Sequence, residues 1–245
     1  ILQAIGRLFV EFRFTDERIL AVVAHPDDAE LLCAGTLARA RRDGAAVGVC
    51  ILCRGDKGQP AERMPNLAAV RRREAAAAAR LLEAKLYHVG FGDGALFDGP
   101  AQRRKVIDVF RAFRPTLVLA HAPEDYHPDH RAASALAEAA SWLAASRGQT
   151  SRRPPLDAPP ALWWIDCVQG TGFEPGFYID ISDFVELKRH MLACHASQLA
   201  RAADPGFAAL DELALRQQAF RGAQAGVLAA EAFRWHRSFR RLRAW

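Results

Sequence analysis

The sequence predicts an α/β fold with a Rossmann-like, mostly parallel sheet and helices on both faces. Short apolar runs alternate with longer segments of helical composition along most of the chain. Continuous apolar strands that alternate with helices are typical of βαβ units, in which both faces of the sheet are covered. Two of the runs are followed at once by histidines and carboxylates, and such sheets bind ligands beyond the carboxyl ends of their strands. We therefore expect the chemistry at that edge of the sheet.

Each element follows from a local pattern. The first strand is a β-branched apolar run, and the helix after it ends at the turn formed by Asp43 and Gly44. Residues 67–83 are rich in alanine and arginine, which are strong helix formers. The predicted strands are residues 19–23, 47–52, 86–89, 117–120, 161–168 and 177–181. The predicted helices are residues 29–42, 67–83, 106–113, 128–145, 184–198 and 210–228.

Composition bounds the organisation of the chain. Of 245 residues, 51% are hydrophobic and 25% are charged, as in a globular protein with a sizeable core. We predict one domain over residues 1–245, with an N-terminal extension at 1–18, a proline-rich surface loop at 148–160 and a C-terminal elaboration at 161–245. Charges interrupt the apolar stretches before they reach 18 residues, so we expect no integral membrane segment. Five cysteines, an odd number, favour reduced thiols and a cytoplasmic protein.

The net charge of +5 comes mainly from arginine, and much of it lies near the C-terminus. Residues 233–243 mix aromatic and basic side chains, which is one signature of segments that bind membrane surfaces or nucleic acid. The segment is short and has no recognition module beside it. We therefore predict a solvated helix face or a subunit contact here, and no nucleic-acid partner.

Two clusters of histidine and aspartate carry the predicted chemistry. Residues 24–30 follow the first strand, and residues 123–130 follow another buried strand. A catalytic zinc site takes three protein ligands from imidazoles and carboxylates and leaves one position for water. His25, Asp28 and His130 provide such a set. The sequence therefore predicts a metal centre formed by two segments that are far apart in the chain.

Three further side chains beside these ligands suit the reaction of an activated water molecule. A bound zinc ion lowers the pKa of water to about 7, and a nearby base must then take its proton. Asp27 is next to the ligand pair and is free for that role. His127 lies one helical turn before His130, where it can donate a proton or stabilise an oxyanion. Asp129 can hold the orientation of the His127 ring.

These motifs resemble those of the PIG-L/LmbE-like family of metal-dependent deacetylases, which remove acetyl groups from N-acetylglucosamine-type sugars. The motifs that carry the resemblance are Ala-His25-Pro-Asp27-Asp28-Ala-Glu30, Pro123-x-Asp125-x-His127-x-Asp129-His130, Arg54-Gly55-Asp56-Lys57-Gly58, Arg71-x-x-Glu74, Phe91-Gly92-Asp93-Gly94 and His195-x-Ser197-Gln198. The resemblance implies Zn²⁺, or another divalent metal such as Fe²⁺, held by His25, Asp28 and His130. It implies Asp27 as the general base and His127 as the residue that stabilises the oxyanion.

The resemblance also implies a substrate, which is a small N-acetylated amino sugar that is hydrolysed by metal-activated water to release acetate. Arg71 and Asp93 match sugar-binding positions, and His195 enters the site from the second half of the chain. The family favours a homo-oligomer. Cys53 stands where the family commonly has threonine, which leaves the shape of the pocket and the identity of the substrate open. The sequence does not decide whether Asp27 alone or His127 protonates the departing amine.

Two other functions fit parts of this pattern. Two histidines and one carboxylate also suit a non-haem iron oxygenase, although those sites commonly have a His-x-Asp spacing in β-rich barrels. A non-catalytic sugar-binding protein would retain the fold, but it would have no need of the base Asp27. Release of acetate without oxygen would exclude the first alternative, and binding of amino sugars without release of acetate would support the second.

Overall fold

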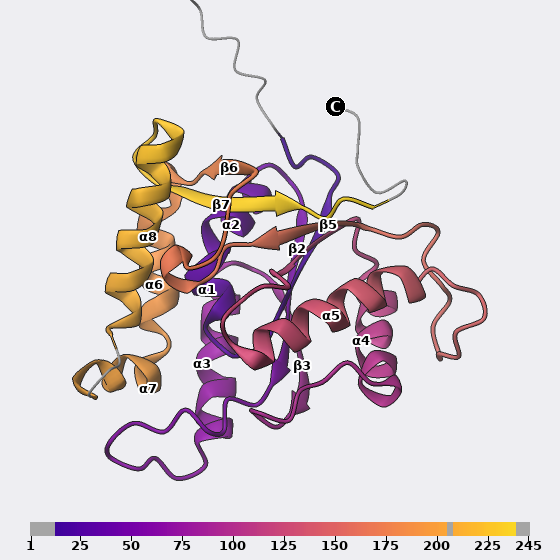
Figure 1. Ribbon diagram of the computed structural model, residues 1–245, viewed down its shortest axis with the longest axis horizontal. Helices are drawn as coiled ribbons and strands as arrows, with labels where there is room; N and C mark the ends of the chain where they lie inside the picture. Colours follow the sequence, from indigo (N-terminus) through magenta and orange to yellow (C-terminus); the bar gives the residue numbers. More distant parts are fainter. Residues whose placement is uncertain (1–12, 205–207, 239–245) are drawn as a thin grey trace, which may run out of the picture.

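The computed structural model describes residues 13–204 and 208–238 of the chain (Figure 1). The strands of these residues form one seven-stranded sheet in the order β3-β2-β1-β4-β5-β7-β6. Strands β1 to β5 pair in parallel, whereas β7 is antiparallel to both of its neighbours. The predicted fold class, an α/β protein with a mostly parallel sheet, is confirmed.

The described residues form strands and helices that alternate from β1 to β5. The strands are β1 (Arg18–Val23), β2 (Ala46–Cys53), β3 (Lys85–Phe91), β4 (Leu117–His121), β5 (Ala161–Ile165), β6 (Phe177–Asp180) and β7 (Ala230–Trp235). The α-helices are α1 (Asp28–Leu32), α2 (Ala34–Arg42), α3 (Leu67–Leu81), α4 (Pro100–Phe113), α5 (Pro128–Leu143), α6 (Val185–Ala193), α7 (Ala196–Leu199) and α8 (Leu210–Ala225). Short 3-10 turns lie at η1 (Val168–Gly170), η2 (Ser182–Phe184) and η3 (Ala200–Ala203).

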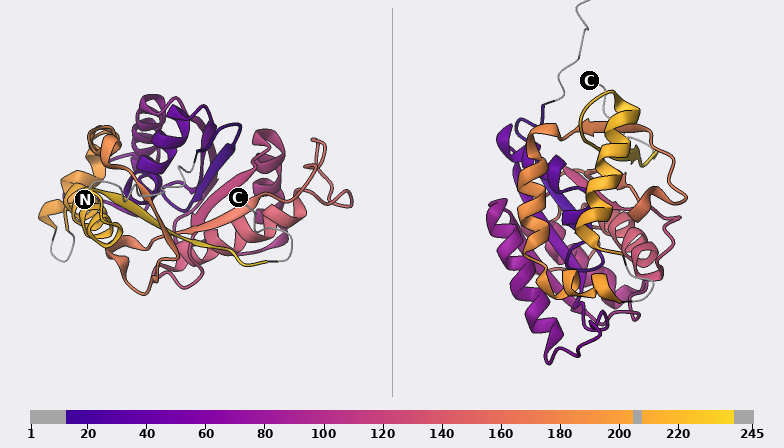
Figure 2. Two further views of the ribbon diagram at one scale, coloured as in Figure 1. Left: turned by 90° about the horizontal axis from the view of Figure 1, so that it is seen from above. Right: turned by 90° about the vertical axis from the view of Figure 1, so that its left-hand side faces the viewer.

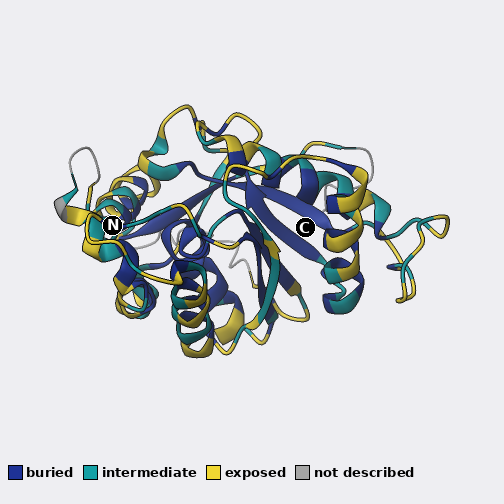
Figure 3. Cartoon of the chain, turned by 90° about the horizontal axis from the view of Figure 1, so that it is seen from below, coloured by how far each residue is buried: buried dark blue, intermediate teal, exposed yellow. Residues whose placement is uncertain are grey.

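The core lies on both faces of the sheet, because the strand residues alternate between two hydrophobic clusters. Ile19 and Val23 of β1 pack in one cluster with residues of α2, α3, α6 and α8. Leu20 and Val22 pack in the other with residues of α4 and α5. Figure 2 shows helices on both sides of the sheet, and Figure 3 shows the strands buried beneath them. Burial on both faces explains why the sequences of these strands are continuous apolar runs.

The order of the strands reverses between β1 and β4, which are parallel neighbours. Val22 of β1 lies opposite Ala120 of β4, so both strands end at the same edge of the sheet. Ligands of open α/β sheets bind in the crevice at such a reversal. The two predicted clusters, at residues 24–30 and 123–130, begin directly after these two strands and are brought together by this pairing.

The structure corrects three of the predicted elements. The helix predicted at residues 29–42 is broken at Cys33, whose φ of −147° is not helical, and forms α1 and α2. The helix predicted at 184–198 is likewise divided into α6 and α7. Two options were predicted for residues 233–243, a solvated helix face or a subunit contact, and the helix face is wrong for Phe233 to Trp235, which belong to β7. Four successive residues at the start of β7 are buried because the strand lies between β5 and β6.

Several expectations concern the chain as a whole. Residues 1–12 of the predicted N-terminal extension and residues 239–245 of the tail lie outside the described residues. All five cysteines are free, as predicted. In the part of the chain that the structure describes, no helix has the length and apolar character needed to cross a bilayer.

A buried carboxylate ties the last strand to the first helices. Glu231 of β7 accepts hydrogen bonds from the backbone N–H groups of Gly35, at 3.0 Å, and Thr36, at 2.7 Å. The ammonium group of Lys188, from α6, donates to the same carboxylate at 2.7 Å. Glu231 is 4% exposed and Lys188 is 2% exposed. This pair satisfies the amino end of α2, and it joins α2, α6 and β7 behind the site.

We expect Lys188→Met to destabilise the protein by about 3–5 kcal/mol, because it leaves the buried Glu231 carboxylate without its cation. Lys105→Met, at an exposed position on α4, is the matched control and should change the free energy of unfolding by less than about 0.5 kcal/mol. Urea denaturation of the two variants measures both values. Equal stability of the two variants would show that the pair contributes little.

Candidate metal and catalytic site

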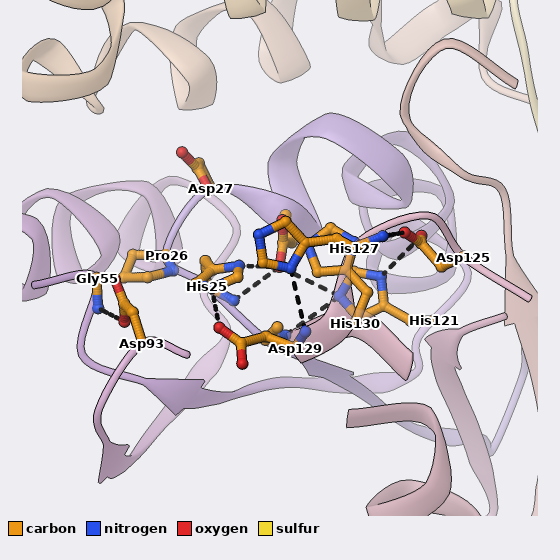
Figure 4. Close-up of polar contacts among 12 residues, drawn as sticks. His25, Pro26, Asp27, Gly55, Asp93, His121, Asp125, His127, Asp129 and His130 are labelled. Carbon is orange, nitrogen blue, oxygen red and sulfur yellow. Dashed lines mark hydrogen bonds and ion pairs between the residues drawn. The ribbon is translucent and has the colours of Figure 1, made fainter. Parts of the chain in front are cut away.

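A pocket of about 480 Å³ opens at the carboxyl ends of β1 and β4. The loop after β1 forms its floor together with the loop after β4, and loops after β2 and β3 close one side. Figure 4 shows the imidazoles of His25, His127 and His130 gathered here beside Asp129. The lining residues are His25, Asp27, Asp28, Leu31, Lys57, Gly58, Arg71, Asp93, Gly94, Tyr126, His127, Pro128, Asp129, His130, Val168, Gln198, Arg201 and Leu210.

The three predicted ligands lie close together in this pocket. Asp28 Oδ2 is 3.6 Å from His25 Nδ1, and Asp28 Oδ1 is 3.4 Å from His130 Nε2. The ring centroids of His25 and His130 are 5.4 Å apart. Two ligands bound to zinc at about 2.0–2.1 Å in tetrahedral geometry stand about 3.3–3.4 Å apart. Each of the two distances from Asp28 is close to this value, although they involve different carboxylate oxygens.

Other side chains beside these residues also have the spacing of metal ligands. Among the described residues, three sets offer ligand atoms that all lie within 4.8 Å of one another. These sets are His25 with His127 and His130, Asp28 with His121 and His130, and His25 with Cys53 and Asp129. The predicted ligands His25, Asp28 and His130 are drawn from the first two of these sets. Asp28 faces His25 with one carboxylate oxygen and His130 with the other.

The site is held together by buried charges of opposite sign. Burial alone would raise the pKa of the Asp28 carboxyl, but the imidazoles of His130 and His121 hold it well below its ordinary value. Burial likewise opposes a charge on His25, yet the carboxylates of Asp129 and Asp28 raise its pKa to about 10. The carboxylates of Asp28 and Asp125 raise the pKa of His130 to about 9 in the same way. In the metal-free protein, both imidazoles are therefore protonated at neutral pH.

Asp27 occupies a backbone conformation that is rare for a residue with a side chain. Its φ is 110° at the start of α1, in a region that residues with a Cβ atom seldom adopt. Asp27 Oδ2 accepts a hydrogen bond from Arg71 Nη2 at 2.9 Å. Burial raises the pKa of the Asp27 carboxyl, against the opposing charge of Arg71. Figure 4 shows Asp27 standing apart from the imidazole cluster.

The orientation of His127 follows from its place at the N-cap of α5. Its Nδ1 accepts a hydrogen bond from the backbone N–H of Asp129 at 3.1 Å. A neutral imidazole whose Nδ1 accepts carries its hydrogen on Nε2. Burial and the neighbouring imidazoles of His130 and His25 lower the pKa of His127. The side chain therefore offers an Nε2–H donor, and it lines the pocket.

The structure corrects the predicted contact of the Asp129 carboxylate. It does not hold the His127 ring, which bonds to the backbone of Asp129 instead. The carboxylate oxygen Oδ2 lies 3.1 Å from His25 Nε2 and accepts a hydrogen bond from Gly94 N–H at 2.8 Å. Because Asp129 is the second residue after the N-cap, its side chain leaves the helix toward the loop after β1. Asp129 therefore orients His25.

The three residues predicted to bind the sugar differ in their positions. Arg71 and Asp93 line the pocket. The Arg71 guanidinium binds Asp27 and the carbonyl oxygen of Pro26, and the Asp93 carboxylate accepts from the N–H groups of Gly55 and Lys57, at 2.8 and 3.0 Å. Both side chains thus already have partners within the protein.

His195 does not line the pocket, so its predicted contact with a substrate has no counterpart here. It is 1% exposed, and its Nε2 lies 3.5 Å from Glu30 Oε2. The two residues Ser197 and Gln198 connect this segment to other walls of the pocket. Ser197 bonds to Glu74 of α3 through its backbone N–H and its hydroxyl, at 2.8 and 2.6 Å, and Gln198 donates to Gly58 O at 3.0 Å.

Sequence reasoning assigned no role to two residues beneath the pocket. Asp125 is 1% exposed and His121 is fully buried, and both lie beside the proposed ligands. His121 is the last residue of β4, and Asp125 stands in the loop that follows. Their signal in the sequence was their position at a strand end, close to the motif that contains His127 and His130.

The fold and the site define an α/β protein with a candidate centre for a divalent metal at the edge of its sheet. The sequence pattern of PIG-L, described as GlcNAc-PI de-N-acetylase, matches residues 20–141, and the chain belongs to this family. The matched region contains both histidine and aspartate clusters. The resemblance inferred from these motifs is therefore confirmed.

Relatives extend the similarity beyond the matched region. A diacetylchitobiose deacetylase from Thermococcus kodakarensis is 29% identical over 195 residues, which are 74% of this chain and 70% of the relative. A 4-oxalmesaconate hydratase from Pseudomonas putida is also 29% identical, over 73% of each chain. The crystal structure of a conserved protein from Thermus thermophilus is 34% identical with a TM-score of 0.78, and the match covers 93% of this chain and 100% of that one.

In the metal-free protein, we expect the free energy of unfolding to fall as the pH rises from about 6.5 to 9. The pKa values of His25 and His130 are raised by folding, to about 10 and about 9, so their ion pairs contribute fully below the unfolded pKa of about 6.5. That contribution is lost as the pH rises toward the folded values. Urea denaturation of EDTA-treated protein at several pH values measures the slope.

The double variant His25→Gln/His130→Gln is the control for this slope, because it removes both titrating imidazoles. Its stability should vary less over the same pH range than that of the parent. A parental protein whose stability stays constant or rises between pH 6.5 and 9 would contradict the assignment of buried, protonated imidazoles.

Proposed function

We propose that this protein is a metal-dependent hydrolase that removes the N-acetyl group from a small amino sugar of the N-acetylglucosamine type. The observation that carries the proposal is the convergence of His25, Asp28 and His130 on one pocket, with Asp27 beside them. Membership of the PIG-L family and the similarity to a diacetylchitobiose deacetylase support it. We assign Zn²⁺, or another divalent ion such as Fe²⁺, to these three side chains.

The donor set fits such an ion. Two imidazole nitrogens and a carboxylate oxygen are the ligands of catalytic zinc sites, and the Asp28 carboxylate lies between His25 and His130, with one oxygen near each ring. When bound, the ion supplies a water molecule of lowered pKa and polarises a carbonyl oxygen. The carboxylate of Asp129 holds the second nitrogen of His25, as outer carboxylates commonly do for ligating histidines.

Asp27 is the general base of the proposed reaction. Its carboxylate lines the pocket beside Asp28, and a burial-raised pKa makes it a better acceptor of a proton than an exposed aspartate. The hydrogen bond from Arg71 fixes one oxygen, Oδ2, and leaves Oδ1 to take the proton from water. As the water oxygen attacks the acetyl carbonyl, this proton moves to Asp27.

His127 stabilises the charge that develops on the acetyl oxygen. Its Nε2–H faces the pocket because Nδ1 is held by the backbone of Asp129. A hydrogen bond from this group strengthens as the carbonyl oxygen becomes an oxyanion. The carbon–nitrogen bond then breaks, acetate is released, and the departing amine takes the proton that Asp27 accepted.

The pocket supports a substrate of sugar size. Its volume of about 480 Å³ lies in the range of small-molecule sites. The polar wall carries Lys57 and Asp93, and the mouth carries Tyr126, an exposed aromatic ring on which a sugar face can pack. Leu31 and Leu210 contribute an apolar wall for the part of the substrate beyond the acetylated ring.

Hydration of an unsaturated acid is a second candidate function. It is favoured by the similarity to the 4-oxalmesaconate hydratase, which covers as much of this chain as the similarity to the deacetylase. Both reactions need an activated water molecule and a base. Incubation of the zinc-loaded protein with N-acetylglucosamine conjugates and with unsaturated dicarboxylates distinguishes the two, by release of acetate or by loss of absorbance of the double bond.

We expect Asp27→Asn to keep its zinc but to lose about 10²–10⁴-fold in kcat for acetate release, the usual contribution of a general base. Asp157→Asn is the matched control, because Asp157 is an exposed aspartate away from the pocket, and it should retain the parental rate. Metal content and acetate release are measured on the same samples. Turnover of the Asp27→Asn variant at the parental rate would exclude Asp27 as the base.

We expect Arg71→Met to lower kcat at least tenfold while KM changes less than threefold, because Arg71 holds Asp27. The neighbouring Arg72, which is exposed on the same helix, provides the control Arg72→Met. Steady-state kinetics on the N-acetyl sugar that gives the highest rate separate the two parameters. A large rise in KM at unchanged kcat would instead identify Arg71 as a sugar-binding residue.

A further inference from the structure

We propose that His121 and Asp125 form a buried support that positions the metal-binding side chains from beneath, with His121 holding Asp28 and Asp125 holding His130. This inference rests on the proposed function, because it takes Asp28 and His130 as ligands of the ion. Neither supporting residue lines the pocket, whereas both proposed ligands do. His121 and Asp125 would therefore act through the ligands, as positioning residues without contact to substrate.

Asp125 contacts the His130 ring as an ion pair and the start of α5 through a hydrogen bond. Its Oδ1 lies 3.2 Å from His130 Nδ1 and accepts a hydrogen bond from the backbone N–H of His127 at 2.8 Å. A carboxylate beside Nδ1 favours the tautomer that has its hydrogen on that nitrogen. When His130 loses one proton to bind an ion, its lone pair is therefore on Nε2, the atom that faces Asp28 Oδ1 at 3.4 Å. Asp125 thus selects the nitrogen that is presented to the pocket.

His121 contacts the second proposed ligand, Asp28. Its ring is fully buried and stacks on the ring of His130, with centroids 3.9 Å apart and an angle of 14° between the planes. His121 Nε2 lies 3.1 Å from Asp28 Oδ2. The other ring nitrogen, Nδ1, faces Asp125 Oδ2 at 3.9 Å and has no hydrogen-bond partner among the described residues. Figure 4 shows His121 beside His130, with Asp125 at the end of the cluster.

The consequence for Asp28 is that its two oxygens are not equivalent. Oδ2 accepts a hydrogen bond from the backbone N–H of His25 at 2.7 Å and has His121 Nε2 at 3.1 Å. Oδ1 faces His130 Nε2 at 3.4 Å. With Oδ2 held by two donors, Asp28 presents Oδ1 as the oxygen available to an ion. The support therefore fixes both the tautomer of one ligand and the oxygen used by the other.

Two groups approach His121 Nε2, and they require different tautomers. The backbone N–H of Ala24 lies at 3.2 Å and would need a lone pair, whereas Asp28 Oδ2 would need a hydrogen. We place the hydrogen on Nε2, because Asp28 is a buried carboxylate and an acceptor beside its oxygen would repel it. His121 also belongs to a set with Asp28 and His130 that has metal-ligand spacing, so a direct role as a ligand is the rival assignment.

The experiment measures the affinity for Zn²⁺ by competition with a chelator, in the parental protein and in three variants of His121. His121→Phe keeps a ring that stacks on His130 but has no donor. His121→Gln places an amide near the position of Nε2, and His121→Asn places one near Nδ1. We expect a loss of about 10–100-fold in zinc affinity for the Phe and Asn variants, and a value within about threefold of the parent for the Gln variant.

The second arm tests Asp125 in the same assay. Asp125→Ala should lose about 10–100-fold in zinc affinity. Asp125→Asn should lose less, because its amide oxygen can still accept from His130 Nδ1. Glu124→Ala, at the adjacent exposed carboxylate, is the matched control and should bind zinc like the parent. A cooperative unfolding transition of each metal-free variant shows that it is folded. If His121→Phe or Asp125→Ala prevents folding, the His121→Gln, His121→Asn and Asp125→Asn variants still test the proposal.

The absorption spectrum of the Co²⁺-loaded proteins separates a support from a ligand. We expect the same band shape and intensity in all folded variants, because the ligand set is unchanged. Parental zinc affinity of His121→Phe, or a Gln variant no better than Phe, overturns the proposal. A changed coordination spectrum in His121→Phe overturns it in favour of His121 as a ligand. If the parental protein binds zinc and releases acetate but the variants give these contradicting results, only the positioning role of His121 and Asp125 is wrong. A parental protein that binds no metal would overturn the proposed function as well.

Discussion

The site depends on the parallel pairing of β1 with β4. Because Val22 lies opposite Ala120, the chain leaves the sheet twice at the same edge, once before His25 and once after His121. The helices that follow the two strands pack on opposite faces of the sheet, α1 and α2 with one cluster and α5 with the other. The crevice lies between these helices, and the two histidine and aspartate clusters meet there, where the loop after β3 also holds Asp129 through Gly94.

Charge neutralisation explains how so many ionisable groups can be buried at this edge. Each carboxylate in the cluster has an imidazole or an N–H group beside it, so none is left as an isolated charge in the interior. In the metal-free protein the protons on His25 and His130 provide two positive charges. A divalent ion would displace these two protons and supply the same charge. The net charge of the cluster is therefore the same in both states.

The sequence predicted the fold class and the location of the site, because both depend on short-range patterns. Apolar runs mark the strands, and the residue types after β1 and β4 mark the chemistry. The direction of a side chain is less predictable, since it is set by backbone geometry and by distant partners. Asp129 was expected to hold His127, yet it holds His25, because the first turn of α5 aims its carboxylate at the other loop. His195 was expected in the pocket, but α7 places it against the buried Glu30.

The second half of the chain contributes to the site by holding it rather than by supplying reacting groups. Ser197 binds Glu74 of α3, and the same helix carries Arg71, which holds Asp27. Tyr126, by contrast, is an exposed residue at the mouth of the pocket. Substrate choice in this protein should accordingly depend on the mouth of the pocket, while the supported floor fixes the chemistry.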